Sequence, residues 1–243
     1  MGVMCNWFGV GCTNLEDGSR QAVVIDNVRY TKSEDSGWLM VLGKSGVKTT
    51  DICEYTKVTL LQEKNGRTYF KIETGPRKGW EVSLKKENAA KYLNKTPPEP
   101  TAAELIVTYQ GREKDWYSPV KGKSYEQQWA EISFNGDTAR VTLNSIWDNS
   151  YTPIPVGVYR ILVPDNPHLS MTEGYRRAEP GLKYDTVWFP IEHGDNSRYV
   201  HVGNVSTGCV TNTTLGKWNA LYKYLISHRP DGTSVGTLTV QLA

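Results

Sequence analysis

The stretch Tyr199–Val210 reads YVHVGNVSTGCV and places a histidine and a cysteine eight positions apart. An apolar run ends at His201, a Gly-Asn turn follows, and Cys209 closes a Ser-Thr-Gly-Cys loop. Gly203 and Gly208 tolerate positive φ, so the chain can fold the thiol back toward the imidazole. A thiol becomes a strong nucleophile when a neighbouring base takes its proton. The stretch therefore predicts an acyl-transfer site with Cys209 as nucleophile and His201 as base.

The residues around Cys209 suit that chemistry, and they also fit a purely structural role. Thr207 and Gly208 are small enough to leave backbone N–H groups free for an oxyanion, and the Ser206 hydroxyl can orient the imidazole or the loop. Free cysteine is nevertheless among the most buried residue types, so a packed thiol is the alternative. A zinc site built from His193, His201 and Cys209 lacks a fourth spaced ligand, and no metal or other cofactor is expected.

The same residues resemble the site of the L,D-transpeptidases, the YkuD-like cell-wall enzymes, which carry a histidine at a strand end before a Ser-x-Gly-Cys loop. The matching residues are His201 and Ser206–Cys209. Upstream, Tyr151–Ile161 (YTPIPVGVYRI) is similar to the Thr-Pro-x-Gly-x-Tyr-x-Ile segment that precedes the site in that family. The resemblance covers roughly the C-terminal half of the chain. It implies a mainly β catalytic domain with one main helix after the nucleophile loop.

This chain departs from the family pattern in the loop itself. The gap from His201 to the cysteine is shorter than usual, and Thr207 and Thr211 stand where the family often has a second histidine and an arginine. His193 lies at a spacing from Ser206 that is closer to the family's. Both histidines are therefore candidates for the base. His201 is favoured because it ends an apolar β-like run, whereas His193 falls in a turn-like Gly-Asp-Asn-Ser segment.

The resemblance also implies a substrate, the stem peptides of peptidoglycan. Cys209 would attack the carbonyl of the third, L-centred linkage, release D-alanine and form a thioacyl enzyme, which an amine acceptor or water then resolves. Substrate-binding residues are expected among His193, Thr207, Arg198 and Tyr184. The last belongs to the segment 164–184, which shows no periodicity and is expected to be a loop or lid whose tyrosines and arginines face the peptide.

Composition narrows the class of partner. The chain has 243 residues, 28 Lys and Arg against 26 Asp and Glu, and a net charge of +2, with no basic cluster, so nucleic acid is not an expected partner. No stretch approaches the roughly 20 apolar residues of a membrane span. The start of the chain, Met1–Cys12, makes no convincing signal peptide. A wall substrate nevertheless implies a periplasmic or extracellular site of action.

Two alternatives to a cell-wall enzyme of the producing cell stay open. One is a non-catalytic wall-binding or adaptor protein built from recognition modules. The other is an antibacterial effector that uses the same chemistry on a competitor's wall, with a secretion machine or an immunity protein as partner.

Four parts are expected along the chain: an N-terminal segment 1–19, an SH3-like β domain 20–93 in the form of a small barrel, a Pro-rich linker 94–101 and the L,D-transpeptidase-like domain 102–243. In the second part, Asn65-Gly66 between two β-like runs is a strong hairpin signal. The run from Tyr69 to Val82 is similar to the closing hairpin of bacterial SH3 domains. The prolines at 97, 98 and 100 favour an extended spacer.

In the last part, alternation predicts strands over 104–109, 129–134, 139–143, 157–163, 186–191, 198–202 and 237–242. Apolar residues at three- and four-residue steps predict a helix over 215–226. Among the remaining cysteines, one disulfide at most is expected, Cys5 with Cys12 or Cys12 with Cys53.

Overall fold

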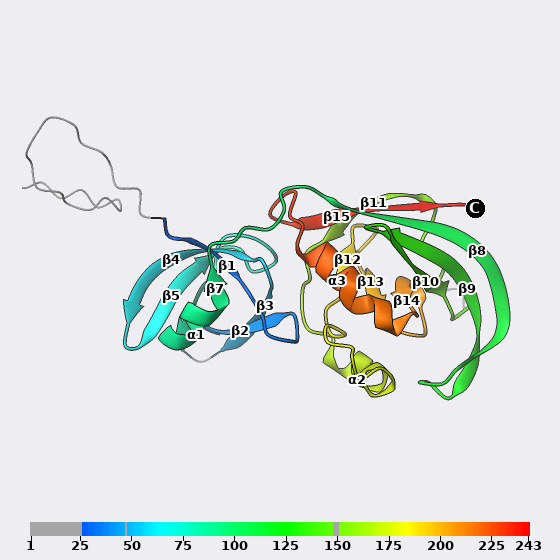
Figure 1. Ribbon diagram of the computed structural model, residues 1–243, viewed down its shortest axis with the longest axis horizontal. Coiled ribbons are helices and arrows are strands. Elements are labelled where there is room, and N and C mark those ends of the chain that lie inside the picture. Colours follow the sequence, from blue (N-terminus) through cyan, green and yellow to red (C-terminus); the bar gives the residue numbers. More distant parts are fainter. Residues whose placement is uncertain (1–25, 47, 148–150) are drawn as a thin grey trace, which may run out of the picture.

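The structure is a computed structural model that describes residues 26–46, 48–147 and 151–243. The expected N-terminal segment 1–19 and the proposed pairing of Cys5 with Cys12 lie outside these residues. Two lobes follow one another along the chain, joined by an extended strap that contains the Pro-rich linker (Figure 1). Strands dominate both lobes, which confirms the mainly β fold class. None of the helices in the described residues has the length and apolar character of a membrane span.

The first lobe is a seven-stranded sheet in which every pairing is antiparallel. The predicted hairpin is confirmed, because Asn65 and Gly66 both adopt positive φ, 51° and 71°, between β4 and β5. The sheet order is β3-β2-β6-β5-β4-β1-β7. The elements are β1 (Val28–Thr31), β2 (Trp38–Gly43), β3 (Thr49–Cys53), β4 (Lys57–Lys64), β5 (Arg67–Ile72), β6 (Glu81–Lys85), α1 (Lys86–Tyr92) and β7 (Leu93–Asn94).

The second lobe is a closed barrel of eight strands, in the order β10-β14-β13-β12-β11-β15-β8-β9. Two of its pairings are parallel, β13 with β14 and β15 with β8. Each of the strands expected from alternation is found. They are β8 (Ala103–Ser118), β9 (Lys123–Phe134), β10 (Asp137–Asn144), β11 (Gly157–Leu162), β12 (Phe189–Ile191), β13 (Arg198–Val202), β14 (Thr207–Asn212) and β15 (Ser234–Gln241).

The predicted helix is present as a short 3-10 turn, η1 (Leu215–Lys217), followed by α3 (Trp218–Ile226). The expectation of one main helix is wrong, because the segment 164–184 contains a second one, α2 (Leu169–Ala178). Thr172 and Tyr175 are buried, while Leu169 is exposed. The segment is polar on average and has Gly174 in the middle of the helix, so its composition did not predict a helix.

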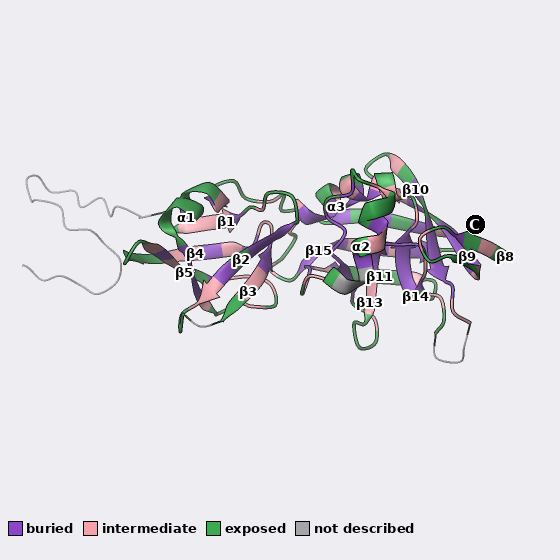
Figure 2. Cartoon of the chain, turned by 90° about the horizontal axis from the view of Figure 1, so that it is seen from below, coloured by how far each residue is buried: buried purple, intermediate pink, exposed green. Residues whose placement is uncertain are grey.

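The two lobes share a hydrophobic core. Trp38 and Cys53 of the first sheet belong to the same buried cluster as the barrel and α3, and the buried band continues between the lobes in Figure 2. Arg229 reinforces the junction, since its guanidinium donates to the Glu54 carbonyl at 2.9 Å. The Tyr222 hydroxyl donates to the Glu54 carboxylate at 2.8 Å.

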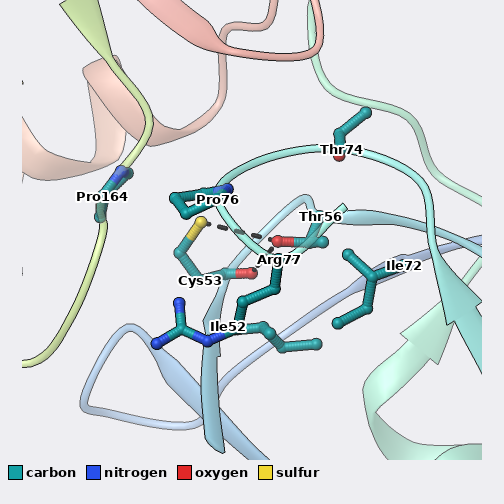
Figure 3. Close-up of a pocket in the computed structure, with 8 residues that line it drawn as sticks. All are labelled: Ile52, Cys53, Thr56, Ile72, Thr74, Pro76, Arg77 and Pro164. Atoms are coloured by element: carbon teal, nitrogen blue, oxygen red, sulfur yellow. Dashed lines mark hydrogen bonds between the residues drawn. The ribbon is translucent and has the colours of Figure 1, made fainter. Parts of the chain in front are cut away.

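Cys53 is a buried free thiol, and Cys12, its alternative disulfide partner, lies outside the described residues. Its sulfur lies 3.6 Å from the Thr56 hydroxyl, and Pro164 of the second lobe faces it across the junction (Figure 3). The hollow beside it holds about 10 Å³, the space of a single water molecule. The cysteine is therefore a packing residue at the junction.

Candidate active site

The parallel pair β13–β14 carries the two predicted catalytic residues. His201 is paired with Thr211, and one step before the pair Val200–Val210 the register sets Tyr199 beside Cys209. Paired residues of neighbouring strands point to the same side of a sheet, so all four side chains share one face, while Val200 and Val210 face the core. Strand spacing and rise put the α-carbons of Cys209 and His201 about 8 Å apart.

His201 is held as a neutral imidazole with a defined tautomer. Its Nδ1 lies 2.9 Å from the Val202 carbonyl, which can only accept, so Nδ1 carries the proton. Its Nε2 lies 3.0 Å from the Thr211 hydroxyl and accepts from it. The ring stacks on Trp188 with centroids 4.0 Å apart. Burial lowers the pKa of His201 to about 4, so the base is unprotonated at neutral pH.

Cys209 is a buried thiol, with only 6% of its surface exposed. Burial raises its pKa to about 11, although the backbone N–H of Tyr199 and the positive charge of Arg198 act in the opposite direction. Among the hydrogen bonds of the described residues, none joins the sulfur to His201, because the two ring nitrogens face Val202 and Thr211. The thiol and the imidazole thus lie on one face, both neutral and with no hydrogen bond between them.

Gly208 and Arg198 shape the chain immediately before the thiol. Gly208 has φ +97°, and a Cβ there would lie 2.7 Å from the Thr152 carbonyl oxygen and 2.8 Å from the Arg198 guanidinium. Arg198 Nη1 donates to the carbonyls of Thr152, at 2.8 Å, and Gly208, at 2.9 Å. Its guanidinium therefore ties the nucleophile loop to the segment before β11, and glycine is needed at 208 for conformation and space.

Ser206 fixes the loop and not the imidazole. Its hydroxyl donates to the Cys209 carbonyl at 2.8 Å, and its backbone N–H donates to the Ser145 hydroxyl at 2.9 Å. The Ser145 hydroxyl donates in turn to Gln127 at 2.6 Å, and the Gln127 amide donates to the Asn204 carbonyl at 2.9 Å. This buried network joins β9 to the segment after β10 and to the loop between β13 and β14, and it holds the backbone of Cys209 in place.

The remaining predicted residues are not brought to the thiol. His193 lies in the turn after β12 and packs edge-on against Tyr159, with ring centroids 5.4 Å apart. Tyr184 is buried and stacks on Tyr222 of α3 at 4.0 Å, so it is a core residue. Thr207 begins β14 and is exposed. Of the two candidate bases, only His201 shares the face of Cys209.

The segment expected as a lid packs on the nucleophile loop through one residue of α2. The Tyr175 hydroxyl accepts from the backbone N–H of Asn204 at 3.1 Å. Arg176 pairs with the buried carboxylate of Asp185, and Arg177 lies 3.7 Å from Glu173 on the exposed side of the helix. The two arginines therefore have carboxylate partners within the protein.

An aromatic stack over His201 was not anticipated from the sequence. Trp188 lies between His201 and His168, with centroids 4.0 and 4.1 Å away, and Tyr199 meets Trp188 and His168 edge-on. His168 Nε2 is 3.5 Å from Asp165 but makes no well-aligned hydrogen bond. Burial alone would raise the pKa of Asp165, but His168 and the Asn166 N–H hold it below its usual value. Only an aromatic-rich composition hinted at such a stack.

Within the described ranges, no group of three or more His, Cys, Asp or Glu side chains is placed to hold a metal ion. Comparisons with protein families, curated proteins and solved structures find no match for this chain. Its chemistry is therefore inferred from its own residues: a thiol, an imidazole and the groups that hold them.

Proposed function

We propose that this protein is a cysteine acyltransferase of the L,D-transpeptidase kind that acts on peptidoglycan stem peptides. One observation carries the proposal. Cys209 and His201 lie on the same face of directly paired strands, two residues out of register, behind a glycine with positive φ. The sequence resemblance to L,D-transpeptidases at these residues supplies the substrate class.

In the proposed reaction, His201 removes the thiol proton as the Cys209 sulfur attacks the L-centred carbonyl. The new S–C bond replaces the C–N bond to D-alanine, and the proton passes from the imidazole to the leaving amine. An acceptor amine, or water, then breaks the thioester, and Cys209 regains a proton. Atoms balance without a metal, an oxidant or a cofactor. These residues thus support crosslinking when the acceptor is an amine and carboxypeptidase activity when the acceptor is water.

The free protein is the resting form of this enzyme. With a thiol pKa of about 11 and an imidazole pKa of about 4, the neutral pair is strongly favoured over the ion pair. His201 Nε2 must exchange the Thr211 hydroxyl for the thiol proton before attack. Bound peptide would trigger the reaction, because proton transfer from the thiol leads to a thioester only when a substrate carbonyl lies next to the sulfur.

The test is incubation of the full chain with tetrapeptide-bearing wall fragments, followed by mass analysis of the products and of the intact protein. The expected result is loss of D-alanine and an acyl adduct that maps to Cys209. Cys209→Ala should abolish turnover, whereas Cys53→Ala, the matched change at the other described buried thiol, should leave the adduct in place. Turnover by Cys209→Ala at the wild-type rate would refute the mechanism.

A second candidate function is favoured by the burial of the site. A thiol that is 6% exposed and an imidazole that is hydrogen-bonded at both nitrogens also suit a recognition module in which neither residue reacts. The same experiment separates the two, since a recognition module binds the fragments and returns them unchanged. No Cys209 adduct forms in that case.

The first lobe would serve as an SH3-like module that presents the wall to the barrel. Support comes from its antiparallel sheet and the confirmed hairpin of β4 and β5. A substrate of this kind sets the site of action in the periplasm or outside the cell. Toxicity on forced periplasmic expression, lost in Cys209→Ala, would identify an effector acting on a competitor's wall.

A further inference from the structure

Arg77 of the first lobe is bonded to the segment of the second lobe that leads into α2. It lies in the turn between β5 and β6, and together with Pro164 it lines the small hollow at the junction (Figure 3). Its Nη1 donates to the Asp165 carbonyl at 2.7 Å, and its Nη2 donates to the Asn166 side-chain oxygen at 2.8 Å. Its Nε donates to the Thr50 hydroxyl within the first lobe. Hydrogen bonds from a charged donor are the stronger kind, so this guanidinium fixes Asp165 and Asn166 from across the junction.

The Asp165 carboxylate lies against the aromatic stack described above. Its Oδ1 is 3.5 Å from His168 Nε2 and accepts from the backbone N–H of Asn166 at 2.8 Å. Its Oδ2 accepts from the Tyr199 hydroxyl at 3.3 Å. The backbone N–H of His168 donates to the Thr186 carbonyl at 2.9 Å. The place of the His168 ring is therefore set by the segment that the first-lobe guanidinium holds.

Trp188 passes the position of His168 to the proposed base. Its ring lies between two imidazoles, within 7° of parallel to His168 at 4.1 Å and within 20° of parallel to His201 at 4.0 Å. Its Nε1 donates to the Asp185 carbonyl at 3.1 Å. Protein interiors are close-packed, so a ring that is held on both faces shifts when one neighbour leaves. His201 must exchange the Thr211 hydroxyl for the thiol proton, and the face of Trp188 defines the plane of its ring during that exchange.

Other hydrogen bonds across the junction lead to different parts of the second lobe. They reach α3, the turn before β15 and the segment after α2, and they join Glu54 to Arg229 and Tyr222, Gly75 to Gly232, and Asp35 to Lys183. Within the described residues, Arg77 is the one first-lobe side chain that hydrogen-bonds the segment leading to His168. It thus gives the first lobe a separate route to the stack.

We propose that Arg77 is a positioning residue for the catalytic base: it holds Asp165 and His168 from the first lobe, and the stack of His168 on Trp188 carries this constraint to His201. The inference rests on the proposed function, which makes His201 the base. It adds a role for the first lobe in the chemical step, apart from any binding of the wall.

Proton NMR of the full-length protein tests the route without turnover. At pH 7 the Cε1–H resonance of His201, identified by its loss in His201→Gln, should be displaced upfield by the ring current of Trp188. We expect Arg77→Met to move it most of the way toward the position of an unstacked imidazole, and His168→Ala to do the same. Arg67→Met is the matched control, because that guanidinium bonds Ser83 of the same sheet, at 2.9 and 3.1 Å, and the resonance should stay in place.

Kinetics with the tetrapeptide-bearing fragments test the consequence for the reaction. A misplaced base slows the chemical step and leaves substrate binding alone, so we expect Arg77→Met to lower kcat about tenfold with KM unchanged. Because Arg77 acts through His168, the double variant of the two should be no slower than His168→Ala. Far-ultraviolet circular dichroism checks that each variant is folded. If Arg77→Met is not, Asn166→Ala takes its place, since it removes one acceptor on an exposed residue and should lower kcat by less.

Three results would overturn the inference: an unmoved His201 resonance in Arg77→Met, an unchanged kcat in that variant of an active enzyme, or losses that multiply in the double variant. A different result separates the inference from the proposed function. If the wild type turns over no fragment but its His201 resonance responds to Arg77→Met and not to Arg67→Met, Arg77 does position the imidazole and the proposed catalytic function fails.

Discussion

His201 makes the stability of this protein sensitive to mild acid. Its pKa is about 4 in the folded protein against an ordinary value of 6.5, because it is buried. Between these values the unfolded chain binds a proton that the folded protein does not, so the free energy of unfolding falls as pH drops through this window. The expected loss from this one group is about 2 kcal/mol between pH 7 and pH 5.

Urea unfolding at pH 7 and pH 5 measures this loss. His201→Gln cannot titrate and should lose much less stability over the same interval, though it will be less stable at pH 7 if packing against Trp188 suffers. His193→Gln is the control, since that residue is in an outer turn, and it should keep the wild-type acid sensitivity. Equal pH dependence in wild type and His201→Gln would show that the imidazole is not buried in solution.

At the scale of elements, the start of β14 depends on Gly208. An alanine there would have to adopt a positive φ, and its Cβ would clash with the carbonyl of Thr152. Either β14 or the Arg198 guanidinium would therefore have to shift. We expect Gly208→Ala to destabilise the fold by about 2–3 kcal/mol and to lower the proposed activity, because Cys209 follows directly. Thermal unfolding and the adduct assay are the measurements.

Gly136→Ala is the matched control for that change. Gly136 has a similar φ of +76°, but nothing lies within 4 Å of the Cβ that alanine would add. The variant therefore has only the conformational cost of a positive φ, about 1 kcal/mol. The difference between the two variants isolates the steric conflict at the nucleophile loop. If the two lose the same stability, Thr152 and Arg198 do not confine the loop.

The elements of this protein were predictable where the signal is local. Asn65-Gly66 and Asn135-Gly136 each form the turn between two successive strands, with positive φ at both residues. An Asn-Gly pair between two β-like runs is a turn signal that the sequence shows directly. The face shared by Cys209 and His201 was only partly predictable. The sequence indicated the two residues, but the parallel pairing, the hydrogen bond to Thr211 and the stack on Trp188 arise from tertiary packing.

At the scale of the whole molecule, Arg229 couples the two lobes. Its guanidinium donates to the carbonyls of Glu54 in the first lobe and of Ile226 and His228 in the second, all within 2.9 Å. We expect Arg229→Met to cost about 2–3 kcal/mol, since bonds from a charged donor are the stronger kind. We expect calorimetry to resolve two unfolding transitions in this variant and a single transition in the wild type, whose lobes share one core.

Arg177→Met provides the comparison for that variant. Arg177 is an exposed arginine whose carboxylate partner, Glu173, is 3.7 Å away on the same helix. Exposed pairs of this kind contribute little, so stability should change by no more than about 0.5 kcal/mol and the single transition should persist. A single transition in Arg229→Met as well would mean that the shared apolar core alone joins the lobes.

The parallel pairing of β15 with β8 has a consequence for how the protein is made. β8 begins at Ala103, and β15, which separates it from β11 in the barrel wall, ends at Gln241. On the ribosome, the first lobe can fold while the chain is still growing, but the barrel wall stays open until β15 has emerged. Until then the backbone N–H and C=O groups along the facing edges of β8 and β11 have no strand partner. The chain is most exposed to aggregation during this interval, so this is when a chaperone would be most needed.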